Sequence, residues 1–135
     1  MTVAPNNLEV SIGGYMGDSF SIELHGETIK YRAYSQGHEL ARTATLKLST
    51  KKWNAFLAVL DEINVWEWQP RYDEPALDGT SWSIRIEHGG RVVESSGSNG
   101  YPSDPDPMTT APHPSTRFSA LLSALSDLLG GRPIH

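Results

Sequence analysis

Alternating apolar and polar residues predict four strands in the first 48 positions of the chain. The alternation runs through residues 8–12, 20–24, 29–33 and 44–48. Side chains two positions apart in a strand point to the same face, so each of these strands is expected to bury one face and leave the other in water. Residues 1–7 are expected to fray at the N-terminus, and residues 35–42 are expected to form a connection.

A turn at Gly26-Glu27 predicts how two of these strands pair. Two-residue turns that contain glycine are typical of β-hairpins. Counting outward from this turn places Leu24 opposite Ile29, an apolar pair, and Glu23 opposite Lys30, an acid facing a base. One register therefore gives both strand faces compatible partners, which is the consistency expected of a real hairpin.

A second turn, at Gly89-Gly90, predicts another hairpin later in the chain. Counting outward from it pairs Ile86 with Val93 and Arg85 with Glu94. The charged pair is expected on the wet face, where it stabilises the hairpin by about 0.2 to 1 kcal/mol. The core face of this hairpin is expected to carry Trp82, Ile84, Ile86 and Val93.

Two amphipathic helices are predicted from apolar residues at helical spacing. The first begins after a cap at Ser49 or Thr50, and the second begins after Ser115 or Thr116 and ends at Gly130-Gly131. The first apolar stripe contains Trp53, Phe56, Leu57, Leu60 and Ile63. The second contains Phe118, Leu121, Leu122, Leu125, Leu128 and Leu129.

These elements predict an α+β fold, with a single, largely antiparallel sheet of about six strands in the order ββββ-α-ββ-α. Both amphipathic helices are expected on one face of the sheet. A length of 135 residues is typical of one domain, so residues 1–135 are treated as such. Residues 103–114 contain four prolines without any periodicity, and we expect a mobile surface loop there.

Composition argues against several classes of site. The chain has no cysteine, and its five histidines form no pair at metal-ligand spacing, so no metal or other cofactor is expected. There is no G-x-S-x-G motif, and no residues combine a nucleophile, a base and an orienting group, so no catalytic residue is assigned. Without a signal peptide or a membrane-spanning apolar run, the expected compartment is the cytoplasm, with no membrane partner.

The net charge of −5 argues against a nucleic-acid partner, because such binding rests on clustered Lys and Arg. Residues 61–78 contain six acids and one base, Arg71. The net charge of this segment, −5, equals that of the whole chain. Two of these acids end the first helix, where they oppose its dipole. Trp and Tyr among acids suit a protein contact. The predicted partner-binding residues are Asp61, Glu62, Trp66, Glu67, Trp68, Tyr72, Asp73, Glu74 and Asp78.

Three sequence segments, VWEW at 65–68, LDGTSW at 77–82 and SSGSNGYP at 95–102, precede an amphipathic helix. In this arrangement the chain resembles small bacterial α+β domains of unassigned function, with an LDGTxW strand and a GxNxYP segment. The resemblance covers about residues 53–129 and implies a sheet with helices, without an activity. The Pro-rich residues 103–114 separate the GxNxYP segment from the helix, and this departure leaves open any function that the segment carries.

The sequence therefore favours a non-catalytic protein-binding module, such as an immunity or antitoxin-type inhibitor that presents an acidic, Trp-bearing surface to a basic protein partner. Both Trp66 and Trp68 could instead close over the core. The alternative function is a small hydrolase or ligand-binding domain, with a pocket near residues 99–114 that includes Asn99 and Tyr101. The prediction leaves the oligomeric state open.

Overall fold

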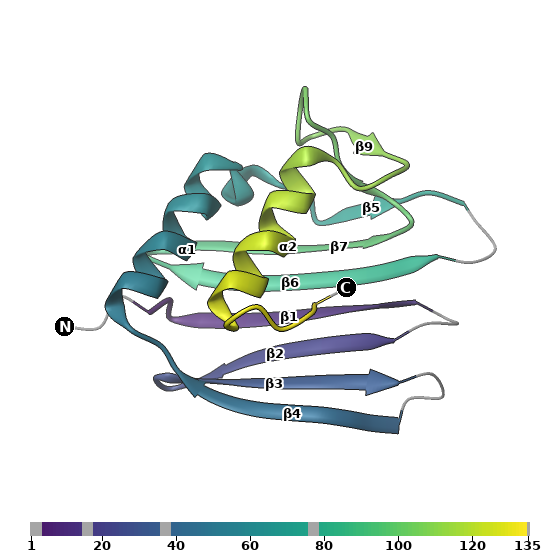
Figure 1. Ribbon diagram of the computed structural model, residues 1–135. Helices are drawn as coiled ribbons and strands as arrows, with labels where there is room; N and C mark the ends of the chain where they lie inside the picture. The colour runs from purple at the N-terminus through teal and green to yellow at the C-terminus, as the bar shows by residue number, and fades with distance from the viewer. Residues whose placement is uncertain (1–3, 15–17, 36–38, 76–78, 135) are drawn as a thin grey trace.

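The computed structural model describes residues 4–14, 18–35, 39–75 and 79–134, and it shows one large sheet with two helices against it (Figure 1). The seven strands of this sheet lie in the order β4-β3-β2-β1-β6-β7-β5. The strands are β1 (Asn7–Gly14), β2 (Ser19–His25), β3 (Thr28–Ser35), β4 (Glu39–Lys47), β5 (Arg71–Asp73), β6 (Thr80–His88) and β7 (Arg91–Ser98).

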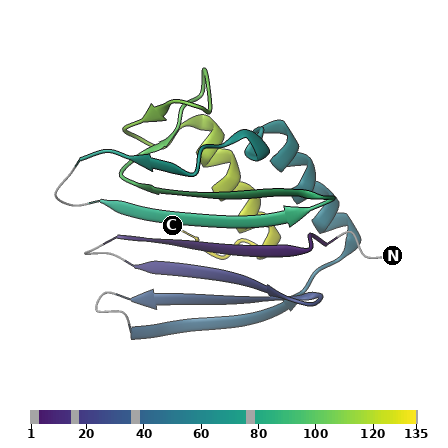
Figure 2. The ribbon, with the colours of Figure 1, turned by 180° about the vertical axis from the view of Figure 1, so that it is seen from behind.

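The remaining elements connect or cover this sheet. Both helices cover the same face of the sheet (Figure 1), and the view from behind shows that the opposite face is bare (Figure 2). They are α1 (Thr50–Glu62) and α2 (Thr116–Leu128), with a short 3-10 helix η1 (Val65–Glu67) after α1. Two further strands, β8 (Tyr101–Pro102) and β9 (Thr110–Ala111), pair with each other in a small separate hairpin.

Both hairpin registers predicted from the glycine turns are confirmed. In the β2–β3 ladder Leu24 pairs with Ile29, and in the β6–β7 ladder Ile86 pairs with Val93. The turn glycines have positive φ, a backbone conformation that side chains with a Cβ rarely adopt. The alternation therefore sends the predicted apolar residues into the core, where Ile86 is fully buried.

The α+β class is confirmed, but the predicted sheet of about six largely antiparallel strands is corrected to a mixed sheet of seven. The additional strand is β5, which pairs parallel to β7 at the sheet edge. It has three residues, of which only Tyr72 is buried, so it is too short to show an alternating pattern. The strand predicted to start near residue 44 begins at Glu39. Residues 39–42, predicted as part of a connection, therefore belong to β4. Residues 36–38 lie outside the described residues.

The predicted helices are confirmed together with their caps. The Ser49 hydroxyl accepts a hydrogen bond from the Lys52 amide, and the Ser115 hydroxyl accepts one from the Phe118 amide. Each bond satisfies a backbone donor that the first helical turn leaves without a partner, which is why serine is favoured at this position. The apolar stripes of both helices then pack on the sheet, and Leu60 and Leu125 are fully buried.

Aromatic rings fill the core where α2 crosses β6. Trp82 lies at the centre, with ring centroids 4.9 Å from Phe118, 6.0 Å from both Trp68 and Tyr72, and 6.5 Å from Tyr101. All five rings are buried. Aromatic pairs at these separations stabilise a core beyond the area they bury. This cluster fixes the position of β5, β8 and the segment between η1 and β5.

Residues 103–114, predicted as a mobile loop, contain β9 and make several contacts with the rest of the protein. Both Asp104 carboxylate oxygens accept backbone hydrogen bonds at the start of α2, from Thr116 at 2.9 Å and Arg117 at 2.8 Å. The Arg117 guanidinium donates to the carbonyl of Ile63, and the Tyr72 hydroxyl donates to the carbonyl of Pro107. The segment is therefore attached through Asp104 and Pro107, and its mobility stays a prediction.

Candidate functional site

The side-chain charges of α1 run against the dipole of the helix at both ends. Lys51 and Lys52 lie in its first turn, which has no acid, and Asp61 and Glu62 lie in its last turn, which has no base. A helix favours acids at its N-terminus and bases at its C-terminus, by about 0.3 to 1 kcal/mol for each charge. Stability alone would favour the opposite arrangement, so both ends of α1 are candidates for a role in binding.

The C-terminal end of α1 leads into a surface that we call the acidic edge. It lies along the sheet edge formed by β5, near η1 (Figure 1). Its five carboxylates have one neighbouring cation within the same segment, Arg71, and its aromatic ring is Trp66. The acidic edge consists of Asp61, Glu62, Trp66, Glu67, Asp73 and Glu74.

Trp66 is held in place by two charged side chains. Its indole nitrogen donates a 3.0 Å hydrogen bond to Asp61, and the Arg91 guanidinium lies 4.5 Å from the centre of its ring. Arg91 also donates to the same Asp61 oxygen, at 3.2 Å. The indole hydrogen bond, with a smaller contribution from Arg91, lowers the pKa of Asp61. Trp66 is half-buried, so this triad holds an aromatic ring at the surface in one orientation.

Two of the predicted partner-binding residues lie in the core instead. Trp68 is 5% exposed, and its indole nitrogen donates to the Ile63 carbonyl at 3.2 Å. Tyr72 is fully buried, its hydroxyl accepts a 2.7 Å hydrogen bond from the Gln69 amide, and burial raises its pKa. Neither ring is available to a partner. The sequence left open the alternative that both rings close over the core. Trp68 does so, whereas Trp66 is only half-buried.

The remaining predicted acids lie on the surface, with one outside the described residues. Glu62, Glu67 and Asp73 are exposed, and Glu74 is half-buried. Asp73 accepts a 3.1 Å hydrogen bond from Arg71 Nε, and the two side chains form an ion pair at 3.0 Å. Both side chains of this pair are largely exposed, so the pair contributes little to stability. Asp78 lies outside the described residues.

The residues of the alternative pocket serve the packing of the strand ends. Tyr101 is 6% exposed, and its ring lies 4.8 Å from that of Phe118 and 6.5 Å from that of Trp82, between centroids. Asn99 takes the left-handed conformation with φ of 60°, and its backbone amide donates to the Thr80 carbonyl. The SSGSNGYP segment thus turns the chain out of β7 and over the aromatic cluster, which gives these residues a structural role.

A basic surface lies at the opposite edge of the sheet, formed by β4, and the sequence analysis did not predict it. Residues 28–52 contain six Lys and Arg and one acid, Glu39. Positive and negative charges are therefore unevenly distributed along the chain outside residues 61–78. Counting charge in shorter windows would have found it. We call this surface the basic edge, and it consists of β4 with Arg42 and Lys47, the first turn of α1 with Lys51 and Lys52, and Arg132 after α2.

Hollows on the described surface occur on both faces of the sheet. On the bare face, Glu9, Arg85, Glu94 and neighbouring serines line one of about 540 Å³. Its guanidinium is already matched by acids, because Arg85 lies 3.8 Å from Glu94 and 3.1 Å from Glu87. Balanced, exposed charge of this kind gives the hollow no strong preference for a charged ligand.

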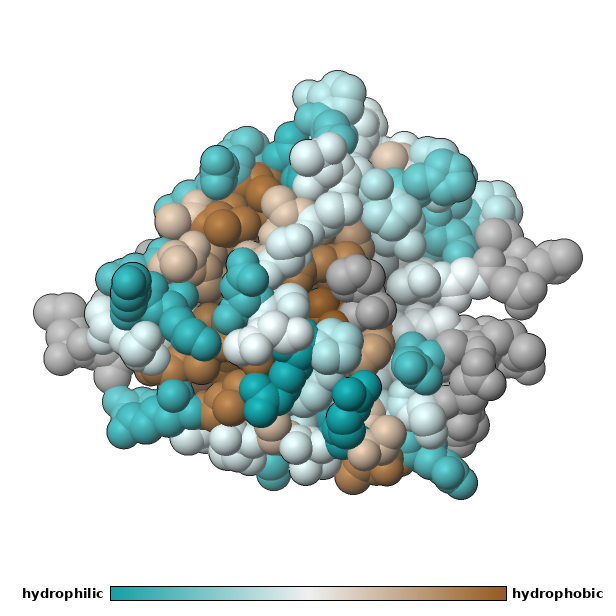
Figure 3. Space-filling view, viewed as in Figure 1, coloured by the Kyte–Doolittle hydropathy of each residue, from teal (hydrophilic) through white to brown (hydrophobic). Residues whose placement is uncertain are grey.

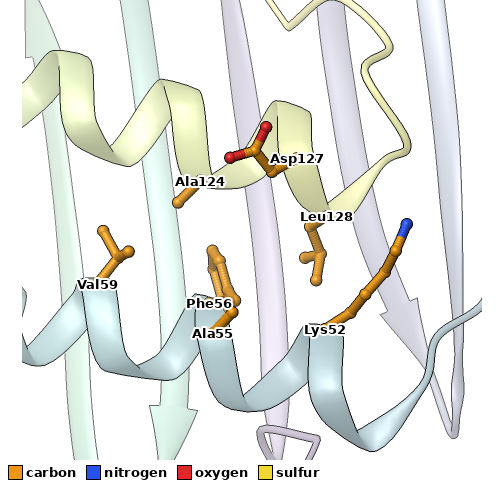
Figure 4. A pocket seen from close by; sticks show the side chains of 7 residues that line it. All are labelled: Lys52, Ala55, Phe56, Val59, Ala124, Asp127 and Leu128. Atoms are coloured by element: carbon orange, nitrogen blue, oxygen red, sulfur yellow. The ribbon is translucent and has the colours of Figure 1, made fainter.

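A smaller, apolar hollow separates the two helices. Hydrophobic atoms gather along and between α1 and α2 on the helical face (Figure 3). The hollow measures about 110 Å³, and the side chains of Phe56, Val59 and Leu128 point into it (Figure 4). At one end, the Lys52 ammonium and the Asp127 carboxylate point away from each other (Figure 4).

The described residues contain no cluster of three or more His, Asp or Glu that would hold a metal ion. Among the same residues, no helix is both long and apolar enough to cross a membrane. No family model matches the chain, and no curated protein matches it.

Proposed function

We propose that the protein is a non-catalytic binding module that presents its acidic edge to a basic partner protein, as an immunity or antitoxin-type inhibitor does. The observation that carries this proposal is the half-exposed Trp66 ring, held by Asp61 and Arg91 and surrounded by carboxylates. Trp and Arg are the side chains most often found at the energetic centre of protein interfaces.

The fixed orientation of Trp66 favours binding in energetic terms. A side chain that is ordered only on binding costs about 0.5 to 1.5 kcal/mol. The hydrogen bond to Asp61 and the stacked Arg91 already order the Trp66 ring in the free protein, so this entropy is not lost again on binding. The ring can then contribute its contact area with little loss of entropy.

The charge around Trp66 favours a basic partner. Glu62 and Glu67 are exposed beside the triad, and Asp73 and Glu74 extend the negative surface along β5. A surface of one sign raises the rate of encounter with an oppositely charged protein and makes that rate depend on salt. The acids are thus assigned to steering and Trp66 to the stability of the complex.

The experiment begins with capture of partners from a native lysate on the immobilised protein, followed by association kinetics with each purified protein that is retained. The test variant is the triple change Glu62→Gln, Glu67→Gln and Glu74→Gln, and Trp66→Ala is tested separately. We expect the triple variant to lower the association rate by about tenfold at low salt and to flatten its salt dependence. Trp66→Ala is expected to raise the dissociation rate by about tenfold or more.

A matched control uses acids on the bare face of the sheet. Glu9→Gln, Glu23→Gln and Glu94→Gln remove the same charge from β1, β2 and β7, at positions outside the six residues of the acidic edge. If the control slows association as much as the test variant, steering depends on net charge alone and the proposed site is wrong. The absence of any retained protein, or kinetics that ignore Trp66→Ala, would also contradict the proposal.

A further inference from the structure

We propose a second interaction surface at the opposite end of the sheet: β4 accepts an extended, acidic segment of a partner protein as an added strand. β4 is the outermost strand, and in neither view does another element cover its outer side (Figures 1 and 2). It is nine residues long, and seven of these are exposed, with Ala44 and Leu46 half-buried. An uncovered edge strand offers a row of backbone donors and acceptors to another chain.

The hydrogen-bonding pattern identifies which residues offer these groups. In an antiparallel ladder, bonded and non-bonded pairs alternate, and a two-residue turn is closed by a bonded pair. His25 and Thr28 close the turn between β2 and β3, so Lys30 and Arg32 bond toward β2 and the residues between them bond toward β4. In β4, the backbone groups of Thr43, Thr45 and Lys47 therefore point away from the sheet.

The edge is regular over the half of β4 that approaches the helices. The only register shift in the β3–β4 ladder lies between Ala33 and Tyr34, near the start of β4. Such irregularities commonly protect an edge strand from pairing. Residues 42–47 lie beyond it and keep an even ladder, so they remain able to pair with an incoming strand.

Side chains beside this regular part favour a segment that alternates apolar and acidic residues. On the helical side, Ala44 and Leu46 are half-buried, and a hollow of about 300 Å³ lies next to Leu46 and Leu48. Lys47, Lys52 and Arg132 line the same hollow. Apolar side chains on one face of an added strand would cover the aliphatic part. Its carboxylates, on the other face, would lie beside Lys47 and Lys30 on the bare side of the sheet, while Lys52 and Arg132 attract them at longer range.

The cations of the basic edge lack strong acidic partners within the described residues. Lys47 lies 3.7 Å from Glu27, but both side chains are mostly exposed, so the pair is weak. Lys52 makes no ion pair there, and its ammonium points away from Asp127 (Figure 4). Lys51 and Lys52 also repel the positive end of the α1 dipole. A bound carboxylate would relieve this accumulated positive charge.

Charge also separates this partner from two other occupants of the edge. A second copy that paired through its own β4 would bring Arg42 and Lys47 against the same cations, which is unfavourable. A nucleic acid would match the charge, but it has no backbone amides to pair with Thr43 and Thr45 and no apolar side chains for the hollow beside Leu46. An acidic polypeptide in extended conformation has the matching charge, the backbone amides and the apolar side chains that this edge requires.

The test uses a fluorescein-labelled, nine-residue peptide of alternating Glu and Val, added to the full-length protein. A Lys-Val peptide of equal length is the charge control, and an alternating Glu-Pro peptide, which cannot form a strand, is the backbone control. We expect the Glu-Val peptide to bind, as measured by fluorescence anisotropy, and to slow amide hydrogen exchange at Thr43 and Thr45. The two control peptides are expected to bind at least about tenfold more weakly.

Two protein variants separate the backbone and charge contributions. Thr45→Pro removes an outward amide without removing a bond to β3, and Thr45→Val is its matched control. Lys52→Glu reverses one charge at the hollow, and Arg71→Glu makes the same change at the far edge of the sheet. Thr45→Pro and Lys52→Glu are each expected to weaken Glu-Val binding by about tenfold, while both controls leave it within about twofold.

Four results would overturn the proposal. They are no saturable binding of the Glu-Val peptide, protection from exchange that maps outside β4, equal binding of the Glu-Pro peptide or of an oligonucleotide, and a homodimer in sedimentation that Thr45→Pro dissociates. The last result would identify a second copy as the occupant. A circular dichroism spectrum and unfolding curve for each variant distinguish lost binding from lost folding.

Discussion

Gly97 lies directly opposite Trp82 in the β6–β7 ladder, and the Trp82 indole nitrogen occupies the space where a Cβ at residue 97 would stand. A Cβ there would lie 2.4 Å from this nitrogen and 2.4 Å from the Gly100 carbonyl oxygen. That carbonyl accepts the Trp82 indole hydrogen bond at 2.9 Å. The absence of a side chain at Gly97 thus lets the central ring of the aromatic cluster lie against the backbone that follows β7.

Gly97→Ala is expected to destabilise the protein, because one methyl group must displace either Trp82 or the Gly100 backbone. Overfilling a packed core costs about 1 to 3 kcal/mol. Chemical denaturation followed by tryptophan fluorescence measures the change. Ser98→Ala, at the neighbouring exposed position of β7, is the control and is expected to stay within about 0.5 kcal/mol of the unchanged protein. Equal stability of Gly97→Ala would show that the Trp82 ring is not confined by this contact.

The two tryptophans of the VWEW segment are expected to differ sharply when each is replaced by alanine. Trp68 is buried against Trp82 and Phe118, so Trp68→Ala should cost about 3 to 5 kcal/mol of unfolding free energy. Trp66 is half-buried and stacks on Arg91, so Trp66→Ala should cost about 1 kcal/mol. Similar losses for both variants, measured by urea denaturation, would contradict the division between core and surface.

Local sequence signals predicted the parts of the fold that depend on neighbours in the chain. The turns at residues 26–27 and 89–90 determined both hairpin registers, and Ser49 and Ser115 marked the starts of both helices. Each of these features is set by backbone conformation or by hydrogen bonds within a few residues. Single-sequence reasoning is strongest for such short-range physics.

The parts that escaped prediction depend on contacts between distant segments. β1 lies in the middle of the sheet because it pairs with β6, whose partner residues lie 66 to 80 positions later, and no local pattern encodes that choice. β5 is recruited by the burial of one residue, Tyr72, among rings from other elements. The same limit applies to the acidic surface, because Trp66 and Trp68 look alike in sequence until Arg91 and Phe118 are placed beside them.

Acid is expected to weaken the start of α2 through Asp104. Its carboxylate accepts hydrogen bonds from the Arg117 and Thr116 amides, and these bonds lower its pKa from 3.8. A lowered pKa in the folded state gives a contribution to stability that is present above pH 3.8 and is lost as the pH falls through the folded value. Asp104→Ala should therefore be less stable at neutral pH and should lose less further stability on acidification.

Thermal unfolding at pH values from about 5 down to about 2 measures the Asp104 contribution. Asp127→Asn is the matched control, since Asp127 is an exposed acid near the other end of α2. The control is expected to follow the pH profile of the unchanged protein. If Asp104→Ala follows it as well, the carboxylate does not hold the start of α2 in solution.

Lys52→Glu is expected to raise the stability of the protein, although the same change should weaken binding at the basic edge. Lys52 is three residues after the Ser49 cap, and glutamate at this position can accept a hydrogen bond from the cap amide in return. It also replaces a repulsive charge at the positive end of the helix with an attractive one, so we expect a gain of about 0.5 to 1 kcal/mol. Asn54→Glu, two positions further along α1 and exposed, is the control for charge and is expected to gain less. Urea denaturation at low and high salt measures both, and the advantage of Lys52→Glu should shrink at high salt.

A gain in stability together with a loss of peptide binding would show that lysine at the start of α1 serves a partner and not the fold. A loss of stability would instead mean that Lys52 makes a favourable contact in the free protein.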